Sequence, residues 1–264
     1  MGSIPRILIV AGSDSSGGAG IQADIKTVTM LGGYAASAVT AVTVQNTLGV
    51  SDVHPVPAAV VAAQIRAVID DIGVDAVKVG MLGSVEVIEA VADVLRGLRV
   101  PIVLDPVMVA KGGAVLLADD AVEALIRRLL PLATIVTPNT PELAALTGVE
   151  IDDEGDAVLA AQELLGIGAR AVLAKGGHLD GGEVADWLVS NNGQTRFASP
   201  RIDTRHTHGT GCTLASAIAL GLGHGKPLAD AVAAARAYVL GAIEHAPEFG
   251  AGHGPLGHNW TLMS

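Results

Sequence analysis

Hydrophobic residues gather in short apolar runs that alternate with longer segments of helical periodicity. The apolar runs predict buried strands at residues 6–11, 36–44, 76–79, 101–104, 134–136 and 171–174. Apolar positions that recur every three or four residues predict helices at 21–31, 58–72, 84–98, 119–130, 157–165, 209–222 and 228–245. Residues 184–189 and 194–197 flank Asn191-Asn192-Gly193, which predicts a hairpin. Repeated strand–helix units predict an α/β fold with a mostly parallel central sheet and helices on both faces.

Neither a linker nor a repeat divides the pattern, so we expect a single domain over residues 1–264. Ligands of such sheets bind beyond the carboxyl ends of the strands. Polar residues follow five predicted strands, at Ser13-Asp14, Gln45-Asn46, Asp105, Asn139 with Glu142, and Lys175. These strand ends are the expected binding site.

Composition narrows the class of protein. The 264 residues are 50% hydrophobic and carry 27 acidic against 16 basic side chains, a net charge of -11. An acidic chain without a basic stripe argues against a nucleic-acid partner. No apolar run reaches the roughly 18 residues of a membrane span. The N-terminus lacks a signal-peptide pattern, and the one cysteine, Cys212, excludes an internal disulfide and a cysteine-based zinc site. We therefore expect a cytoplasmic protein without a membrane partner.

The glycine-rich segment Gly17-Gly18-Ala19-Gly20 has several interpretations. It follows a strand and matches the dinucleotide fingerprint, but no acidic residue lies between Ile25 and Ser51 to bind a ribose hydroxyl. A nicotinamide dehydrogenase is therefore disfavoured. A flexible turn remains open, as does a loop that closes over a small molecule, with Asp24 one helical turn inside.

A second glycine-rich segment, Gly209-Thr210-Gly211-Cys212, precedes an apolar helix. Unpaired N–H groups at a helix N-terminus bind anions without basic side chains. A plain helix cap would explain Thr210 alone. The helix start is also expected to lower the pKa of Cys212, which leaves a cysteine hydrolase with His206 or His208 as base as an alternative.

Two carboxylates and a lysine complete the candidate chemistry. Asp105 and Glu142 follow neighbouring strands, and oxygen ligands of this kind suit Mg²⁺. Asn139 and Glu142 are spaced to share one face of a first helical turn. Simpler explanations are a turn acid at Asp105 and a favourable charge near a helix N-terminus at Glu142. Lys175 is either an ordinary strand-end residue or a cation that offsets phosphate charge.

Taken together and in order, these motifs resemble those of the ribokinase-like small-molecule kinases. Within them the chain is most similar to the hydroxymethylpyrimidine/phosphomethylpyrimidine kinases of thiamine biosynthesis. The resemblance runs from about residue 7 to 258 and is carried by AGSDSSGGAGIQAD from Ala11, VQNT from Val44, KVGML from Lys78, DPVM from Asp105, TPNxxE from Thr137, KGGH from Lys175 and HGTGCT from His208.

The resemblance implies roles for matching positions. Gly209, Thr210 and Gly211 would form the anion hole for the transferring phosphate. Asn139 and Glu142 would organise Mg²⁺ and the nucleotide phosphates, and Lys175 would contact those phosphates. Gln45 would hydrogen-bond an aminopyrimidine, in a substrate pocket lined by Gly12, Asp24, Met81 and Met108.

Cys212 stands where most ribokinase-like enzymes carry an aspartate base. Cysteine there is typical of the branch with this pyrimidine kinase and some pyridoxal kinases. The implied reaction uses ATP and Mg²⁺ to phosphorylate 4-amino-5-hydroxymethyl-2-methylpyrimidine and then its monophosphate. Pyridoxal kinase is the nearest alternative; a cysteine hydrolase and a non-catalytic nucleotide-binding protein are alternatives of other classes. Such kinases are commonly homodimers. For His253 and His258 we expect a loop flanking the active site rather than a metal site.

Overall fold

One sheet forms the centre of the molecule. The computed structural model describes residues 4–109, 113 and 116–263. Within them the strands form a nine-stranded sheet in the order β3-β2-β1-β4-β5-β6-β7-β8-β9. The strands are β1 (Arg6–Asp14), β2 (Tyr34–Asn46), β3 (Gly49–Pro55), β4 (Ala76–Val79), β5 (Ile102–Leu104), β6 (Ile135–Val136), β7 (Ala171–Lys175), β8 (Glu183–Ser190) and β9 (Gly193–Pro200).

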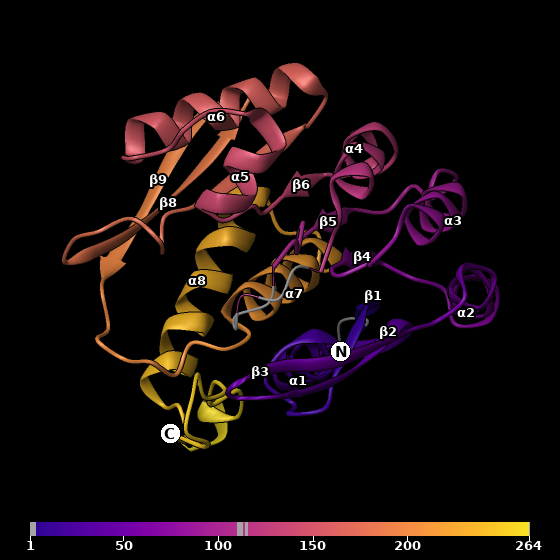
Figure 1. The fold of residues 1–264 in the computed structure, drawn as a ribbon, viewed down its shortest axis with the longest axis horizontal. Coiled ribbons are helices and arrows are strands. Elements are labelled where there is room, and N and C mark those ends of the chain that lie inside the picture. The colour runs from indigo at the N-terminus through magenta and orange to yellow at the C-terminus, as the bar shows by residue number, and fades with distance from the viewer. Residues whose placement is uncertain (1–3, 110–112, 114–115, 264) are drawn as a thin grey trace.

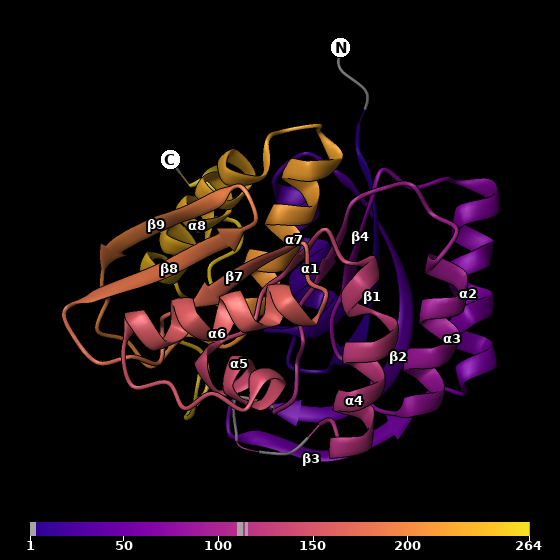
Figure 2. The same ribbon diagram turned by 90° about the horizontal axis from the view of Figure 1, so that it is seen from above.

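Helices cover both faces of this sheet (Figures 1 and 2). They are α1 (Gly20–Met30), α2 (Ala58–Asp71), α3 (Val85–Leu95), α4 (Asp119–Arg128), α5 (Thr140–Thr147), α6 (Glu154–Ile167), α7 (Thr210–Gly223) and α8 (Leu228–Glu244), with short 3₁₀ turns at Leu130–Leu132 and Trp260–Leu262. Helices α2 to α6 contribute to the core on one face, and α1, α7 and α8 contribute to the core on the other.

Alternation along the strands builds the two halves of the core. Leu8 and Val77 belong to the cluster under α2–α6, whereas their neighbours Ile7 and Ala76 belong to the cluster under α7 and α8. Successive side chains of a strand point to opposite faces, so a strand covered on both faces is apolar throughout. Helix α7 is buried over most of its length, which explains why its sequence is apolar all round.

The chain order reverses on the two sides of β1. Strand β1 pairs in parallel with β2 on one side and with β4 on the other, and β5, β6 and β7 continue the parallel part. Such a reversal opens a crevice at the carboxyl ends of the strands. Antiparallel strands occur only at the edges among the described residues: β3 at one edge, β8 and β9 at the other.

The fold class expected from the sequence is confirmed, as are the six strands predicted for the parallel part, the seven predicted helices and the hairpin. The sequence pattern missed β3. Its residues are mostly exposed at the sheet edge, so they lack the apolar run of a buried strand. The assignment of the whole chain to one domain stays a prediction. None of the helices in the described ranges is both long and apolar enough to cross a membrane.

Candidate functional site

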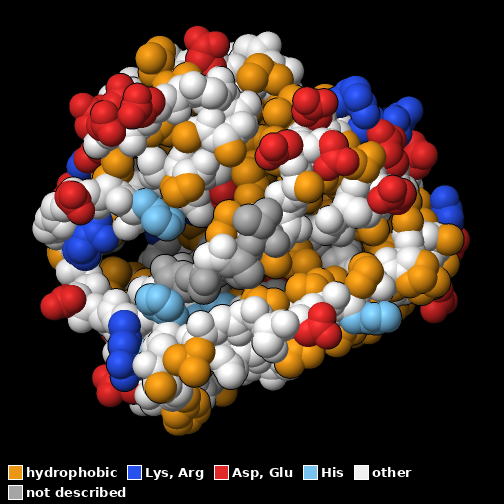
Figure 3. All heavy atoms as spheres, viewed as in Figure 1, with side chains coloured by type: hydrophobic (Ala, Val, Ile, Leu, Met, Phe, Trp, Pro, Cys, Tyr) orange, Lys and Arg blue, Asp and Glu red, His pale blue; other side chains and the backbone are white. Residues whose placement is uncertain are grey.

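A cavity of about 800 Å³ lies at the carboxyl ends of the parallel strands. Figure 3 shows the corresponding hollow in the surface, with histidine side chains on either side of it. Its size is within the range of small-molecule sites, which run from about 300 to 1,000 Å³. Nearly all the residues predicted from the sequence line it, namely Gly12, Gln45, Met81, Asp105, Met108, Asn139, Glu142, Lys175, Gly209, Thr210, Gly211 and Cys212. The fold therefore brings together strand ends that are far apart in the chain.

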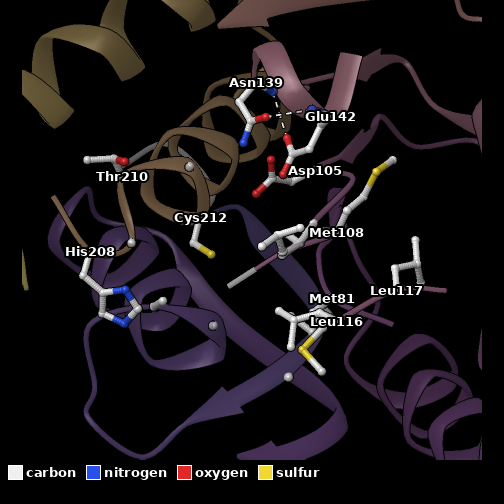
Figure 4. A pocket seen from close by; sticks show the side chains of 18 of the residues that line it. Met81, Asp105, Met108, Leu116, Leu117, Asn139, Glu142, His208, Thr210 and Cys212 are labelled. Atoms are coloured by element: carbon white, nitrogen blue, oxygen red, sulfur yellow. Dashed lines mark hydrogen bonds between the residues drawn. The ribbon is translucent and has the colours of Figure 1, made fainter. Parts of the chain in front are cut away.

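One end of the cavity is strongly polar. Asp105 Oδ1 accepts hydrogen bonds from Lys175 Nζ and from Thr137 Oγ1, both at 3.0 Å. Lys175 Nζ also lies 3.9 Å from Glu142 Oε2. Figure 4 shows Asp105, Glu142 and Asn139 grouped on one side of the cavity. A cation between two carboxylates is a setting in which phosphate oxygens and a divalent metal can be accommodated.

Burial and charge set the protonation of this group. Burial alone would raise the pKa of Asp105, but the charges of Lys175 and Lys78 outweigh it and hold that pKa below its usual value. Burial raises the pKa of Glu142 to about 7; the charge of Lys175 opposes this rise and that of Asp105 adds to it. The same two carboxylates raise the pKa of Lys175 against the effect of its own burial. Lys175 therefore stays charged at neutral pH.

Asn139 and Glu142 were expected on one face of the first turn of a helix, but only Glu142 lies in that turn. Asn139 is the N-cap of α5 and precedes its first turn. Its Oδ1 accepts from the Glu142 N–H at 2.9 Å, and Glu142 Oε2 accepts from the Asn139 N–H at 2.8 Å. This capping box satisfies two backbone donors and places both side chains at the cavity wall. The helix-terminal explanation of Glu142 is thus correct for the structure, and a metal role stays a prediction.

The start of α7 lies next to that group. Gly209 is its N-cap with a φ of 86°, and Thr210 is the first helical residue rather than the cap. A Cβ on Gly209 would lie 1.9 Å from the carbonyl oxygen of Gly18, so the two glycine-rich segments pack backbone against backbone. A Cβ on Gly211 would point between Lys175 Nζ, at 3.3 Å, and Asp105 Oδ2, at 3.6 Å. Gly211 therefore lies beside Lys175, in a first helical turn whose N–H groups have no acceptors earlier in the helix.

Cys212 follows directly and its sulfur points into the cavity (Figure 4). The expectation that the helix start lowers its pKa is wrong. Burial raises the pKa of the thiol to about 11; the charge of Lys78 and a hydrogen bond from the Gly20 backbone oppose the rise, while Asp24 and Asp105 add to it. In the described part of the chain no hydrogen bond joins Cys212 to a histidine. The thiol–imidazole pair of a cysteine hydrolase is therefore not formed there.

The other end of the cavity is less polar. Met81 and Met108 line it, and a Cβ on Gly12 would lie 3.1 Å from Met81 Sδ, so glycine there leaves room beside the thioether. The Gln45 side chain contacts Thr43 Oγ1 at 3.2 Å and lies 3.4 Å from His208 Nε2. Two thioethers offer apolar contact to a flat ring and the Gln45 amide offers a donor and an acceptor, while the aminopyrimidine pocket itself stays a prediction.

Asp24 is the one predicted site residue that does not line the cavity. It is fully buried in α1, where its carboxylate accepts from Lys78 Nζ at 2.9 Å and from Ser216 Oγ at 2.7 Å. Lys78, its partner, does line the wall. The expectation that Asp24 contacts a ligand directly is thus corrected, because the helix turns this side chain towards the core. A lysine inside the four-residue buried strand β4 was the available sequence signal for Lys78.

A buried pair ties the first glycine loop to α7. His208 Nε2 lies 2.8 Å from Asp14 Oδ2, and the same carboxylate accepts from Ser16 Oγ and from the Ala19 N–H. Burial would raise the pKa of Asp14, but these hydrogen bonds lower it to about 2. Asp14 is therefore ionised, and His208 donates its Nε2–H to it. The loop is thus an ordered wall of the site rather than a flexible turn.

The C-terminal segment also flanks the site. His253 lines the cavity, and His258 Nε2 lies 3.0 Å from Thr213 Oγ1 on α7. Across residues 4–109, 113 and 116–263, no group of three or more His, Cys, Asp or Glu side chains is arranged to hold a metal ion. The position of both histidines agrees with the expected flanking loop.

Comparisons with known proteins point to one family. The family model described as phosphomethylpyrimidine kinase matches residues 14–257. A hydroxymethylpyrimidine/phosphomethylpyrimidine kinase from Streptomyces coelicolor is 52% identical over 258 residues, which cover 98% of this chain and 96% of the relative.

Solved structures agree on the fold. A pyridoxal kinase from Bacillus subtilis in an ADP complex superposes with a TM-score of 0.92 at 35% identity, covering 99% of this chain and all of that one. A phosphomethylpyrimidine kinase from Clostridium difficile gives a TM-score of 0.80 at 42% identity, covering 91% of this chain and all of that one. The family model spans most of the sequence and the relatives align along nearly their whole length, so the chain belongs to the phosphomethylpyrimidine kinase family.

Proposed function

We propose that this protein transfers the γ-phosphoryl group of ATP to the hydroxymethyl group of 4-amino-5-hydroxymethyl-2-methylpyrimidine, and then transfers a second phosphoryl group to the monophosphate. The observation that carries this proposal is the division of one cavity into two ends. A Gln45–methionine end suits a flat heteroaromatic ring, and the Lys175–α7 end suits phosphate. Cys212 lies between them, where the acceptor hydroxyl would meet the transferring group (Figure 4).

Residues at the phosphate end bind and orient the nucleotide. The N–H groups at the start of α7 and the Lys175 ammonium provide preorganised positive charge for the transferring phosphoryl oxygens. This explains how a chain of net charge -11 binds a polyanion. The Bacillus subtilis pyridoxal kinase, which shares the fold, was solved as an ADP complex, which supports nucleotide binding by this chain.

Asp105 and Glu142 fit a magnesium ion. Both are carboxylates at the cavity wall beside Lys175. Among the described residues the two side-chain donors to Asp105, Thr137 and Lys175, both bind Oδ1, which leaves Oδ2 for a metal ion. Mg²⁺ needs only one or two protein carboxylates when phosphates and waters complete its shell. When bound, the ion would neutralise charge on the nucleotide phosphates. The two carboxylates would hold it, and Asn139 would keep Glu142 in place through the capping box.

Cys212 is proposed as the group that accepts the proton of the attacking hydroxyl in the first transfer. The hydroxyl oxygen forms a bond to the γ-phosphorus, the bond to ADP breaks, and the proton goes to the sulfur. In the second transfer the attacking oxygen belongs to a phosphate that is already ionised, so no base is needed. A thiol with a pKa of about 11 is mostly protonated at neutral pH, so an orienting role for the thiol is the competing explanation.

The two roles differ in the kinetics of Cys212 variants. With a base role, Cys212→Ala slows the first transfer by about 10²–10⁴-fold and leaves the second within about threefold, because only the first needs a proton acceptor. Cys212→Asp restores part of the first transfer, whereas Cys212→Ser, a weaker base of similar size, does not. ADP release is measured separately with each substrate. Equal losses in both transfers would overturn the base role.

Pyridoxal is the competing acceptor, because the Bacillus subtilis pyridoxal kinase superposes closely. The ratio of kcat/KM for the pyrimidine and for pyridoxal decides between them. Nucleotide binding without ADP release for either acceptor would contradict a kinase altogether.

A homodimer and a cytoplasmic location stay predictions. The ribbon of β2 and β3 exposes the apolar side chains of Val42, Val44, Leu48 and Val53. An exposed apolar edge of this kind is suited to a second copy of the chain. Light scattering of the purified protein tests this, and Val44→Glu should give a monomer.

A further inference from the structure

Lys78 is a fully buried cation at the wall of the cavity. It lies in β4 between Val77 and Val79, and its one hydrogen-bond partner in the described structure is Asp24 at 2.9 Å. Burying such a pair is costly, and well-packed apolar residues of the same volume are often as stable or more so. An ion pair kept inside an apolar strand at the wall of an active site therefore points to a role beyond stability.

Lys78 lies directly behind the cavity lining, although its side chain is fully buried. A Cβ on Gly80 would lie 2.8 Å from Lys78 Nζ, so glycine at that position makes room for the ammonium. Asp24 also accepts from Ser216 Oγ of α7 at 2.7 Å, and Ser216 lies four residues after Cys212, so Cys212 is on the helix face that meets the Lys78–Asp24 pair. Lys78 and Cys212 both line the cavity, and the charge of Lys78 lowers the pKa of the Cys212 thiol.

We infer that Lys78 is a positioning residue for the phosphoryl transfer: held by Asp24, its ammonium stabilises the negative charge that Cys212 carries as a base. This inference rests on the proposed function, since it assigns Cys212 its counterion. Lys78 acts through the sulfur and need not touch the substrate.

The charges around the sulfur come from several elements. Lys78 on β4 and the Gly20 backbone at the start of α1 favour the thiolate, and Asp24 on α1 and Asp105 after β5 oppose it. Lys175 on β7 also interacts with the sulfur. Lys78 has the largest effect after burial, and it exceeds that of Asp24. The pKa of Lys78 is itself raised, because Asp24 and the other anions outweigh its burial, so it is charged at every working pH.

The single cysteine allows a direct test. Alkylation by iodoacetamide followed against pH reports Cys212 alone, because the chain has no other thiol. Asp24→Asn removes an anion and leaves the Lys78 charge without its carboxylate, so the midpoint of alkylation should fall. The double variant Asp24→Asn with Lys78→Met removes both charges, so the midpoint should rise. Each pH unit by which the midpoint shifts changes the alkylation rate about tenfold when that rate is measured at a fixed pH below the midpoint.

The inference is supported if the alkylation midpoint falls in Asp24→Asn and rises in the double variant. A purely structural role of the Lys78–Asp24 pair would shift the midpoint in the same direction in both variants. The matched control replaces Arg6 and Asp75, an ion pair between the start of β1 and the residue before β4, with Met and Asn. It should leave the midpoint unchanged. Thermal unfolding confirms that each variant is folded; if Asp24→Asn alone does not fold, the neutral double variant decides. A midpoint that does not rise in the double variant overturns the inference.

Kinetics separate this inference from the proposed function. In the double variant the first transfer should slow at least tenfold more than the second. Equal slowing would mean that Lys78 stabilises phosphate charge instead, and would overturn its role towards Cys212. If the wild-type protein phosphorylates neither the pyrimidine nor its monophosphate, the proposed function fails, and the alkylation midpoints still decide whether Lys78 stabilises the thiolate.

Discussion

The methyl group of Gly211→Ala would enter the space in which a transferring phosphate is expected. Gly211 is the second residue of α7 and does not have a positive φ, so alanine fits its backbone. The added Cβ would lie 3.3 Å from Lys175 Nζ and 3.6 Å from Asp105 Oδ2. Both atoms belong to the polar end of the cavity, and the Lys175 side chain can give by a few tenths of an ångström. The variant therefore narrows the phosphate end of the cavity while the fold is kept.

The expected magnitudes have opposite signs for stability and for activity. Replacing a glycine by alanine where the backbone conformation is compatible stabilises a protein by roughly 0.4–1 kcal/mol, because the unfolded chain loses freedom. Removing one preorganised oxyanion contact costs about 10²–10³ in kcat. Gly211→Ala should therefore be as stable as the wild type or slightly more stable, and slower by at least two orders of magnitude.

The assay measures ADP release at saturating ATP and Mg²⁺ together with thermal unfolding of the ligand-free protein. Gly166→Ala is the matched control: Gly166 lies in α6, and a Cβ there would meet nothing within 4 Å. That variant should gain similar stability and keep full activity. If Gly211→Ala turns over at the wild-type rate, phosphate does not approach this helix start and the anion-hole assignment fails. If Gly211→Ala is destabilised by more than about 1 kcal/mol, the reasoning about its backbone fails.

Three further predictions follow from the same contacts. Gly209→Ala should greatly reduce the yield of folded protein, because its Cβ would lie 1.9 Å from the Gly18 carbonyl oxygen at a φ of 86°; soluble yield and thermal unfolding measure this, and wild-type stability would refute the close packing of the two loops. Asp14→Asn should lower the free energy of unfolding at pH 7 by about 2 kcal/mol. The pKa of Asp14 is lowered to about 2 in the folded state, so the stability that its carboxylate contributes is present above its unfolded value of 3.8 and is lost as the pH falls towards 2. Denaturant unfolding between about pH 2 and 7 should accordingly show a flatter acid limb in the variant than in the wild type. The pKa of Glu142 is raised to about 7, so the stability that its protonated form contributes is present below its unfolded value of 4.5 and is lost as the pH rises through 7. Glu142→Gln can keep the capping box, so it should be more stable than the wild type at about pH 8 and should need at least tenfold more Mg²⁺ for half-maximal activity. An unchanged Mg²⁺ requirement would count against Glu142 as a metal ligand.

Local pattern was enough to predict most of the fold. Residues 76–79 form β4 with the expected bounds, because a short apolar run bounded by polar and glycine residues has few alternatives. Strand β3 escaped prediction because edge strands pair through their backbones and need no apolar face. The strand-end rule placed Gln45, Asp105 and Lys175 in one cavity, since parallel strands bring their carboxyl ends to the same edge of the sheet.

The local sequence pattern could not predict the contacts of Asp24 or the pKa of Cys212. Asp24 was expected in the cavity, but α1 turns it to the core, where Lys78 and Ser216 are its partners. Cys212 was expected to be acidic from its position at a helix start, yet burial, with Asp24 and Asp105 nearby, raises the pKa of its thiol to about 11. The two partners of Asp24 are 54 and 192 residues away from it in the chain, and no spacing rule connects them.

The sequence by itself determined the order of strands and helices, the glycine-rich segments and the kinds of side chain that follow each strand. It did so because periodicity and turn chemistry act over a few residues. Only the tertiary structure decided which charges face one another: Lys78 with Asp24, Lys175 with Asp105, and His208 with Asp14. The reason is physical, since the energy of a charge depends on its distance from other charges and on its exclusion from water, and both are properties of the folded chain.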